Sequence, residues 1–167
     1  MEDRNYIIRD ALPGDAEEIA RIYNYYIEKT IITFEEEAVS GDTIEGRMQD
    51  VRSSRFPWFV AEQDGRLLGY SYACKWKERR SYRYSSEVTV YLGPGHVGKG
   101  IGTALYGKLL PAIKSRRIHV AVGGIALPNE ASVKLHEKMG FLKSAHFKEV
   151  GFKFNRWIDV GYWQCIL

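Results

Sequence analysis

The chain has 167 residues, of which 45% are hydrophobic and 13% aromatic, and this is enough apolar material for one domain with a sizeable core over residues 1–167. Its formal net charge of +3 is scattered, so we expect no nucleic-acid or membrane partner. Cys74 and Cys165 lack the paired spacing of a zinc site and are too few to staple a secreted fold. No apolar run reaches the length of a signal peptide core or a membrane span. We therefore expect a cytoplasmic protein without a metal site.

The first half of the chain alternates between apolar patterns and helix-start or turn signals. The patterns predict a strand, two helices and two strands over residues 6–9, 15–27, 42–51, 58–62 and 67–76. Asp15 is placed to cap the first helix, with Glu18 at capping-box spacing, and Asp42 or Thr43 can start the second helix. The Asp-Gly pair at 64–65 is a strong hairpin signal, so we expect antiparallel strands here.

The second half predicts a strand, a helix, a strand, a helix and a closing hairpin over residues 84–92, 101–113, 118–127, 129–140 and 141–167. In the first of these strands, period-two alternation puts Glu87, Thr89 and Tyr91 on one face. Asn129 is a good cap for the last helix. The order β-α-α-β-β-β-α-β-α-β-β indicates an α/β (α+β) layer fold, with a mixed, mostly antiparallel sheet flanked by helices.

A glycine-rich stretch, residues 93–103, joins a predicted strand to a predicted helix, where backbone N–H groups can converge on a phosphate. A nucleotide P-loop needs Ser or Thr where Gly100 stands, and a dinucleotide site needs an acidic residue where the basic stretch 114–117 lies. Both interpretations are therefore weak. A glycine turn that only connects two elements remains open at this point.

The segment 97–102, Val-Gly-Lys-Gly-Ile-Gly, resembles the pyrophosphate-binding signature of the GNAT superfamily of N-acetyltransferases. Val97 departs from the usual Arg or Gln at the first position, and Lys99 or His96 could compensate for it. Because that family holds the pyrophosphate mainly through backbone amides, the departure should weaken the site without removing it. The resemblance implies the GNAT fold and acetyl-CoA as cofactor.

Within that superfamily, ordered matches from residue 8 to residue 163 resemble the phosphinothricin acetyltransferase group. They lie at residues 56–62, 76–82, 87–91, 128–129, 135–137, 150–153 and 159–163. For this group the resemblance implies acetyl transfer to the α-amine of an amino-acid analogue, such as phosphinothricin, methionine sulfoximine or methionine sulfone, by a homodimer. Phe154 and Ile158 replace residues that are often histidine in members acting on phosphinothricin, and this leaves the substrate open.

The same resemblance implies roles for two ionisable residues. Glu87 matches the general base that deprotonates the amine, and such a base is needed because an ammonium group has no lone pair for attack. His136 stands where many relatives have a tyrosine that protonates the departing thiolate, and its unperturbed pKa near 6.5 suits that role or the orientation of substrate. Without the resemblance, a solvated strand glutamate and a structural helix histidine would be the default interpretations.

The remaining site residues are also implied by the resemblance. Coenzyme contacts are expected at Val90, Tyr91, Leu92, Val97, Gly98, Lys99, Gly100, Ile101, Gly102, Thr103 and Asn129. Substrate contacts are expected at Phe34, Lys77, Arg79, Tyr82 and Thr89. A backbone N–H near Val90 would meet the oxyanion of the reaction. Two other functions stay open: acetylation of protein N-termini or lysines, and acyl-CoA sensing without catalysis.

Overall fold

The computed structural model describes residues 5–167. The strands are β1 (Ile7–Asp10), β2 (Trp58–Gln63), β3 (Arg66–Lys75), β4 (Ser85–Leu92), β5 (Val120–Leu127), β6 (Leu142–Lys153) and β7 (Arg156–Ile166). The helices are α1 (Ala16–Lys29), α2 (Gly41–Ser53), α3 (Ile101–Lys114) and α4 (Glu130–Lys138), with short 3-10 turns η1 (Pro13–Asp15) and η2 (Arg80–Tyr82). The predicted order of strands and α-helices is confirmed. No helix in the described range is long and apolar enough to cross a membrane.

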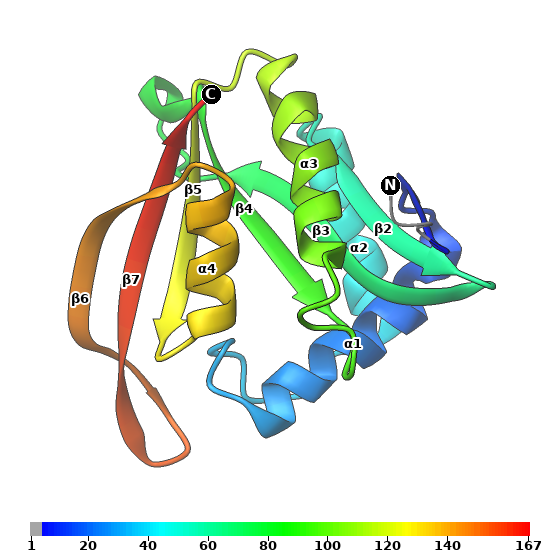
Figure 1. Cartoon of the computed structure of the whole chain (residues 1–167), viewed down its shortest axis with the longest axis horizontal. Helices are drawn as coiled ribbons and strands as arrows, with labels where there is room; N and C mark the ends of the chain where they lie inside the picture. The colour runs from blue at the N-terminus through cyan, green and yellow to red at the C-terminus, as the bar shows by residue number, and fades with distance from the viewer. Residues whose placement is uncertain (1–4) are drawn as a thin grey trace.

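All these strands form one sheet in the order β1-β2-β3-β4-β5-β7-β6, which is covered by helices on both faces (Figure 1). Neighbouring residues of β2 illustrate the two cores, because successive side chains of a strand point to opposite faces. Val60 belongs to the apolar cluster of α1 and α2, whereas Phe59 belongs to the cluster of α3. The sheet is therefore a wall between two packed layers.

That wall opens between β4 and β5, the two strands that run parallel. Their pairing is limited to residues 85–87 of β4 against residues 120–122 of β5. Beyond this point β4 continues along β3, and β5 continues along β7, while the two strands separate (Figure 1). The separation leaves a wedge-shaped gap in the middle of the sheet.

The start of α1 differs from the prediction. The Asp15 carboxylate accepts the backbone N–H of Leu12 at 2.7 Å and binds the Arg9 guanidinium at 2.7 and 2.8 Å, so it does not cap α1. Glu18 accepts the backbone N–H of Leu67 at 3.1 Å instead of completing a capping box. Asp15 is the N-cap residue of α1, as predicted, but the predicted side-chain capping contacts of Asp15 and Glu18 are wrong, because other partners take these carboxylates.

The other helix starts can be read from their caps. The Ser40 hydroxyl accepts the backbone N–H of Thr43 at 3.1 Å, so α2 begins just before the predicted Asp42. Asn129 accepts the backbone N–H of Ser132 at 3.2 Å, which confirms its predicted role as the cap of α4.

Candidate active site

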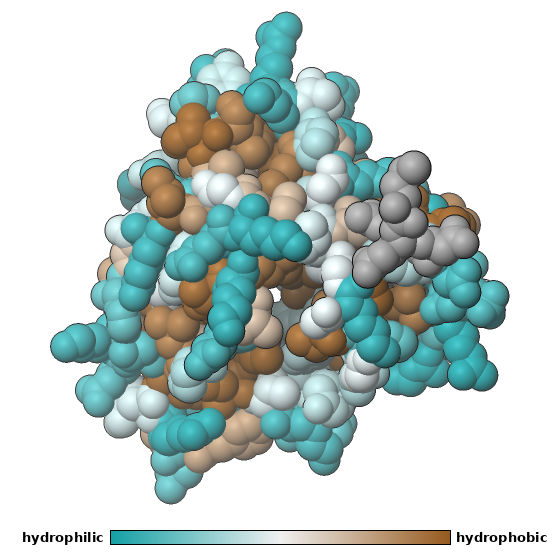
Figure 2. All heavy atoms as spheres, in the orientation of Figure 1, coloured by the Kyte–Doolittle hydropathy of each residue, from teal (hydrophilic) through white to brown (hydrophobic). Residues whose placement is uncertain are grey.

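A cavity of about 1170 Å³ occupies the gap between β4 and β5. Tyr106 of α3 and His136 of α4 line it from one face of the sheet, while Phe34 of the α1–α2 loop and Tyr162 of β7 also contribute to its wall. Figure 2 shows the molecule hollowed near its centre, on the face where α3 and α4 lie. Its volume is somewhat above the range of about 300–1,000 Å³ that is usual for small-molecule sites. The gap can therefore accommodate two molecules that meet inside the sheet.

Glu87 lies at the point where the pairing of β4 with β5 ends. It shares a face of β4 with Tyr91, whose ring packs against Tyr23 of α1 at a centroid distance of 5.1 Å. Burial raises the pKa of the Glu87 carboxyl, and the positive charge of Lys77 opposes this effect. No residue in the described part of the chain donates a hydrogen bond to this carboxylate. Glu87 is thus a half-buried carboxylate that faces the cavity.

His136 is held at both ring nitrogens. Its Nδ1 lies 2.8 Å from the carbonyl oxygen of Ser132, so Nδ1 carries the proton and donates it. Its Nε2 then accepts from the hydroxyl of Tyr106, 3.1 Å away. Burial lowers the pKa of His136, the backbone contact at Ser132 opposes this, and the ring packs edge-on against Phe141. The result is a neutral, oriented imidazole at the α3–α4 side of the cavity.

The glycine-rich loop follows β4 and ends at the first residue of α3. Gly95, Gly98 and Gly100 have φ values of 80°, 81° and 77°, a conformation that other residues adopt only with strain. The helix begins with Gly100 as its N-cap and without a side-chain cap, so the N–H groups of its first turn are available to a ligand. These residues fit a diphosphate group, because backbone amides at a helix N-terminus bind anions.

The predicted site residues divide into two groups. Those that line the cavity are Phe34, Lys77, Tyr82, Glu87, Thr89, Val90, Tyr91, Asn129 and His136. Those that lie outside it are Arg79, Leu92, Val97, Gly98, Lys99, Gly100, Ile101, Gly102 and Thr103. The loop members of the second group follow the end of β4 and lead into α3.

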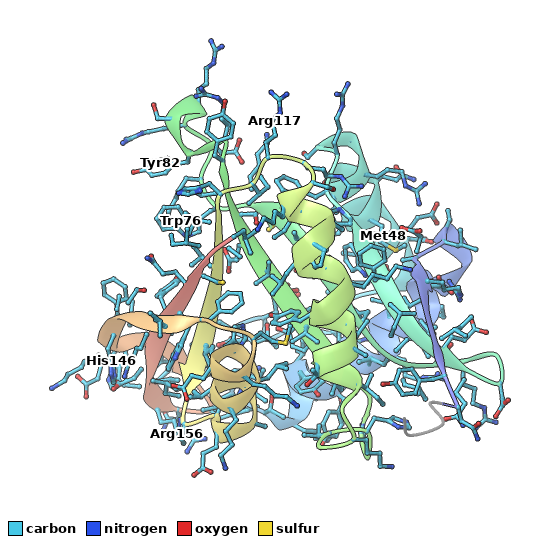
Figure 3. The ribbon with its side chains drawn as sticks, turned by 45° about the horizontal axis from the view of Figure 1, so that its top comes forward. Met48, Trp76, Tyr82, Arg117, His146 and Arg156 are labelled. Atoms are coloured by element: carbon cyan, nitrogen blue, oxygen red, sulfur yellow. The ribbon has the colours of Figure 1, made fainter. Side chains whose placement is uncertain are left out.

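Arg79 is the substrate-binding candidate that the structure leaves outside the cavity. Its exposed side chain lines a separate depression, which it shares with Lys77 and Tyr82. Figure 3 shows Tyr82 beside Trp76 near the end of β3, and their rings meet edge-on at 5.2 Å. Both aromatic residues line the cavity, whereas Arg79 does not.

The loop that carries Phe34 is attached to the β6–β7 hairpin. Lys153 is buried, and its Nζ donates to the carbonyl oxygen of Thr33 at 2.8 Å. The hydroxyls of Thr33 and Tyr23 are 2.7 Å apart. Gly151 lies so close to Phe34 that a Cβ at Gly151 would come within 2.1 Å of the aromatic ring. These contacts hold Phe34 in the wall of the cavity.

Sequence reasoning missed several wall residues. Tyr106 reads as one more apolar residue of a helix, and Tyr162 as part of a closing strand. The consecutive glycines Gly123 and Gly124 were a usable signal, because glycine inside a strand marks a close approach of other groups. Within residues 5–167 there is no cluster of three or more His, Cys, Asp or Glu side chains that could hold a metal ion.

Comparison with known proteins gives concordant results. A family model described as an acetyltransferase (GNAT) domain matches residues 8–161. The chain is 37% identical to the phosphinothricin N-acetyltransferase of Streptomyces viridochromogenes, over 98% of this chain and 88% of that protein. It is 33% identical to the L-methionine sulfoximine/L-methionine sulfone acetyltransferase of Salmonella typhimurium, over 94% and 92%. A solved acetyltransferase from Salmonella typhimurium with its cofactor acetyl-CoA superposes with a TM-score of 0.95 at 32% identity, over 98% and 95%.

Proposed function

Because the chain belongs to the GNAT family of acetyltransferases, we propose that it transfers the acetyl group of acetyl-CoA to the α-amine of a small amino-acid analogue. Phosphinothricin, methionine sulfoximine and methionine sulfone are the proposed acceptors, and the names of two similar proteins support this choice. The observation that carries the proposal is the position of Glu87, an unpaired base in a cavity that passes through the sheet.

The proposed coenzyme site runs from the glycine loop into the gap. Acetyl-CoA, when bound, supplies an acetyl group activated as a thioester. Backbone N–H groups of residues 98–103 bind its diphosphate. The edge of β4 at residues 90–92 and the side chain of Asn129 hold the arm, and a backbone N–H near Val90 stabilises negative charge on the carbonyl oxygen.

On the acceptor side, Glu87 removes a proton from the ammonium group, directly or through a water molecule, so that the amine has a lone pair for attack. Its raised pKa favours this, because a more basic carboxylate takes the proton more readily. Lys77 and Tyr82 bind the acidic end of the acceptor within the cavity, Arg79 attracts it from the neighbouring depression, and Phe34 and Thr89 close the pocket.

His136 orients the coenzyme side of the site in this proposal. Its Nε2 accepts a hydrogen bond from the hydroxyl of Tyr106, and this pair is the proposed source of a proton for the leaving thiolate. The lowered pKa of His136 favours the neutral ring, which accepts the hydrogen bond of Tyr106 without carrying a positive charge.

We further propose a cytoplasmic homodimer. The β6–β7 hairpin at the edge of the sheet exposes large apolar side chains, which are Leu142, Phe147, Val150, Phe152, Phe154 and Trp157. An exposed patch of this kind is typical of an interface. The free cysteines Cys74 and Cys165 are compatible with a reducing compartment.

The test is thiol release from acetyl-CoA by purified protein against phosphinothricin, methionine sulfoximine, methionine sulfone, ordinary amino acids, polyamines and peptides. Turnover confined to the amino-acid analogues supports the proposal. Turnover with peptides alone would favour a protein acetyltransferase, and binding of acetyl-CoA without turnover of any acceptor would favour a sensor.

A further inference from the structure

Gly124 is an unusual residue for its place in the fold. It lies in the middle of β5, a central strand, and pairs with Tyr162 of β7. Its backbone is exposed although the residues on either side of it are buried, because it faces the cavity. A glycine here weakens the strand, since it has no side chain to pack and loses more conformational freedom on folding. Its φ is not in the left-handed region, so the backbone conformation does not require glycine.

The space beside Gly124 lies between two groups of the site. A Cβ built on it would be 3.2 Å from Cε1 of Tyr162 and 3.8 Å from Oε1 of Glu87. The missing side chain thus leaves an opening of about one methyl group between the proposed base and an aromatic ring. An acceptor whose amine approaches Glu87 along β5 has its neighbouring carbon atoms beside this opening.

The chemistry of the acceptor explains why such an opening would matter. The α-carbon of an amino acid carries a carboxylate and a side chain in addition to its amine, whereas the corresponding carbon of a simple primary amine carries one chain only. Resting on the function proposed above, we propose that Gly124 is a specificity-determining residue, whose bare backbone admits amines on a branched carbon.

Packing in the core requires glycine at position 123 but not at position 124. A Cβ at Gly123 would lie 2.4 Å from Nε2 of the buried His136, so a side chain there collides with the core. At Gly124 the nearest contact is 3.2 Å from a ring edge, which can yield by a few tenths of an ångström. An alanine at Gly124 is therefore compatible with folding, and its methyl group occupies space in the cavity.

The experiment compares the wild-type protein, Gly124→Ala and the control Gly107→Ala on two acceptors. Gly107 lies on α3, and a Cβ there would meet nothing within 4 Å. One acceptor is methionine sulfone. The other is 3-(methylsulfonyl)propylamine, the same molecule without the α-carboxylate, assayed at concentrations that span its KM.

We expect Gly124→Ala to lower kcat/KM for methionine sulfone about tenfold or more, mainly through KM, which is the size of effect that one methyl group has in a fitted pocket. For the unbranched amine the change is at most about twofold, the KM for acetyl-CoA is unchanged, and Gly107→Ala behaves as wild type. An equal loss for both acceptors, or no loss for methionine sulfone, overturns the inference. A wild-type protein that acetylates neither acceptor would overturn the proposed function as well.

Discussion

Gly123→Ala is a substitution for which the structure predicts a large effect from a single added carbon, because the new atom would collide with a buried ring. The new Cβ would lie 2.4 Å from Nε2 and 2.7 Å from Cδ2 of His136, whereas ordinary contacts are about 1 Å longer. The ring has little room to retreat, because it packs against Tyr106 at 5.3 Å and Phe141 at 5.1 Å between ring centroids. The imidazole must therefore rotate or shift away from β5.

Three contributions set the magnitude. Overpacking a core costs about 1–3 kcal/mol. The shift also breaks the hydrogen bond between His136 and Tyr106, and a buried hydroxyl left without its partner costs about 1–3 kcal/mol. Replacing glycine restores about 0.4–1 kcal/mol by restricting the unfolded chain. The net loss is about 3 kcal/mol, which corresponds to a decrease in Tm of about 6–12 °C for a chain of this size.

The assay is urea unfolding with a double-mutant cycle. Gly123→Ala is measured in the wild-type protein and again in a His136→Ala background, where the smaller side chain leaves room for the added methyl group. We expect the cost to fall from about 3 kcal/mol to below about 1 kcal/mol in that background. A free energy of unfolding within about 0.5 kcal/mol of wild type for Gly123→Ala, or the same cost in both backgrounds, would refute the proposed contact.

Three further predictions concern the ionisable groups. Glu87→Gln should lower kcat about 100-fold or more without changing the Kd for acetyl-CoA. In the wild type, kcat/KM should fall as the pH drops through a Glu87 pKa above 4.5. Stopped-flow kinetics measure kcat and calorimetric titration measures the Kd, and an unchanged kcat in Glu87→Gln would show that Glu87 is not the base. Because the folded state lowers the pKa of His136, the unfolded chain binds the proton more readily, so the free energy of unfolding should fall as the pH drops below 6.5. In His136→Gln this contribution to the fall should be absent when unfolding curves at pH 7 and pH 5 are compared. Lys153→Met should raise the acceptor KM about fivefold with an unchanged KM for acetyl-CoA, because the Thr33 carbonyl loses its donor and Phe34 is held less firmly. Steady-state kinetics in which the two KM values change equally, or neither changes, would contradict this.

The predictable part of the fold is the part that depends on local pattern. Period-two alternation placed Glu87 and Tyr91 on the same face of β4, and helical spacing located α3 after the glycine loop. The identity of helix caps was less predictable, since Asp15 has a choice of partners. Arg9, which comes from another element, engages it together with the backbone N–H of Leu12. Local sequence does not reveal such competition.

The cavity itself depends on contacts between distant segments. Neither Tyr106 nor Tyr162 carries a sequence signal for a place in its wall, because their positions result from the docking of α3 and β7 on the sheet. Conversely, Arg79 stands next to lining residues in the sequence, but the turn that carries it points to the surface. Proximity along the chain was a poor guide to position around the site.

The break in hydrogen bonding between β4 and β5 is what converts a buried sheet into a site. Glu87, the proposed base, lies on the α1–α2 face of β4, whereas Val88 belongs to the core under α3. A fully paired sheet would therefore keep the acceptor amine and the coenzyme on opposite sides. Pairing ends after Glu87, and the facing edges of β4 and β5 beyond it have no strand partner in the described chain. Backbone groups in such a gap need other hydrogen-bond partners, and a ligand can provide them. Glu87 at the apex of the gap then faces an amine that enters from the α1–α2 face.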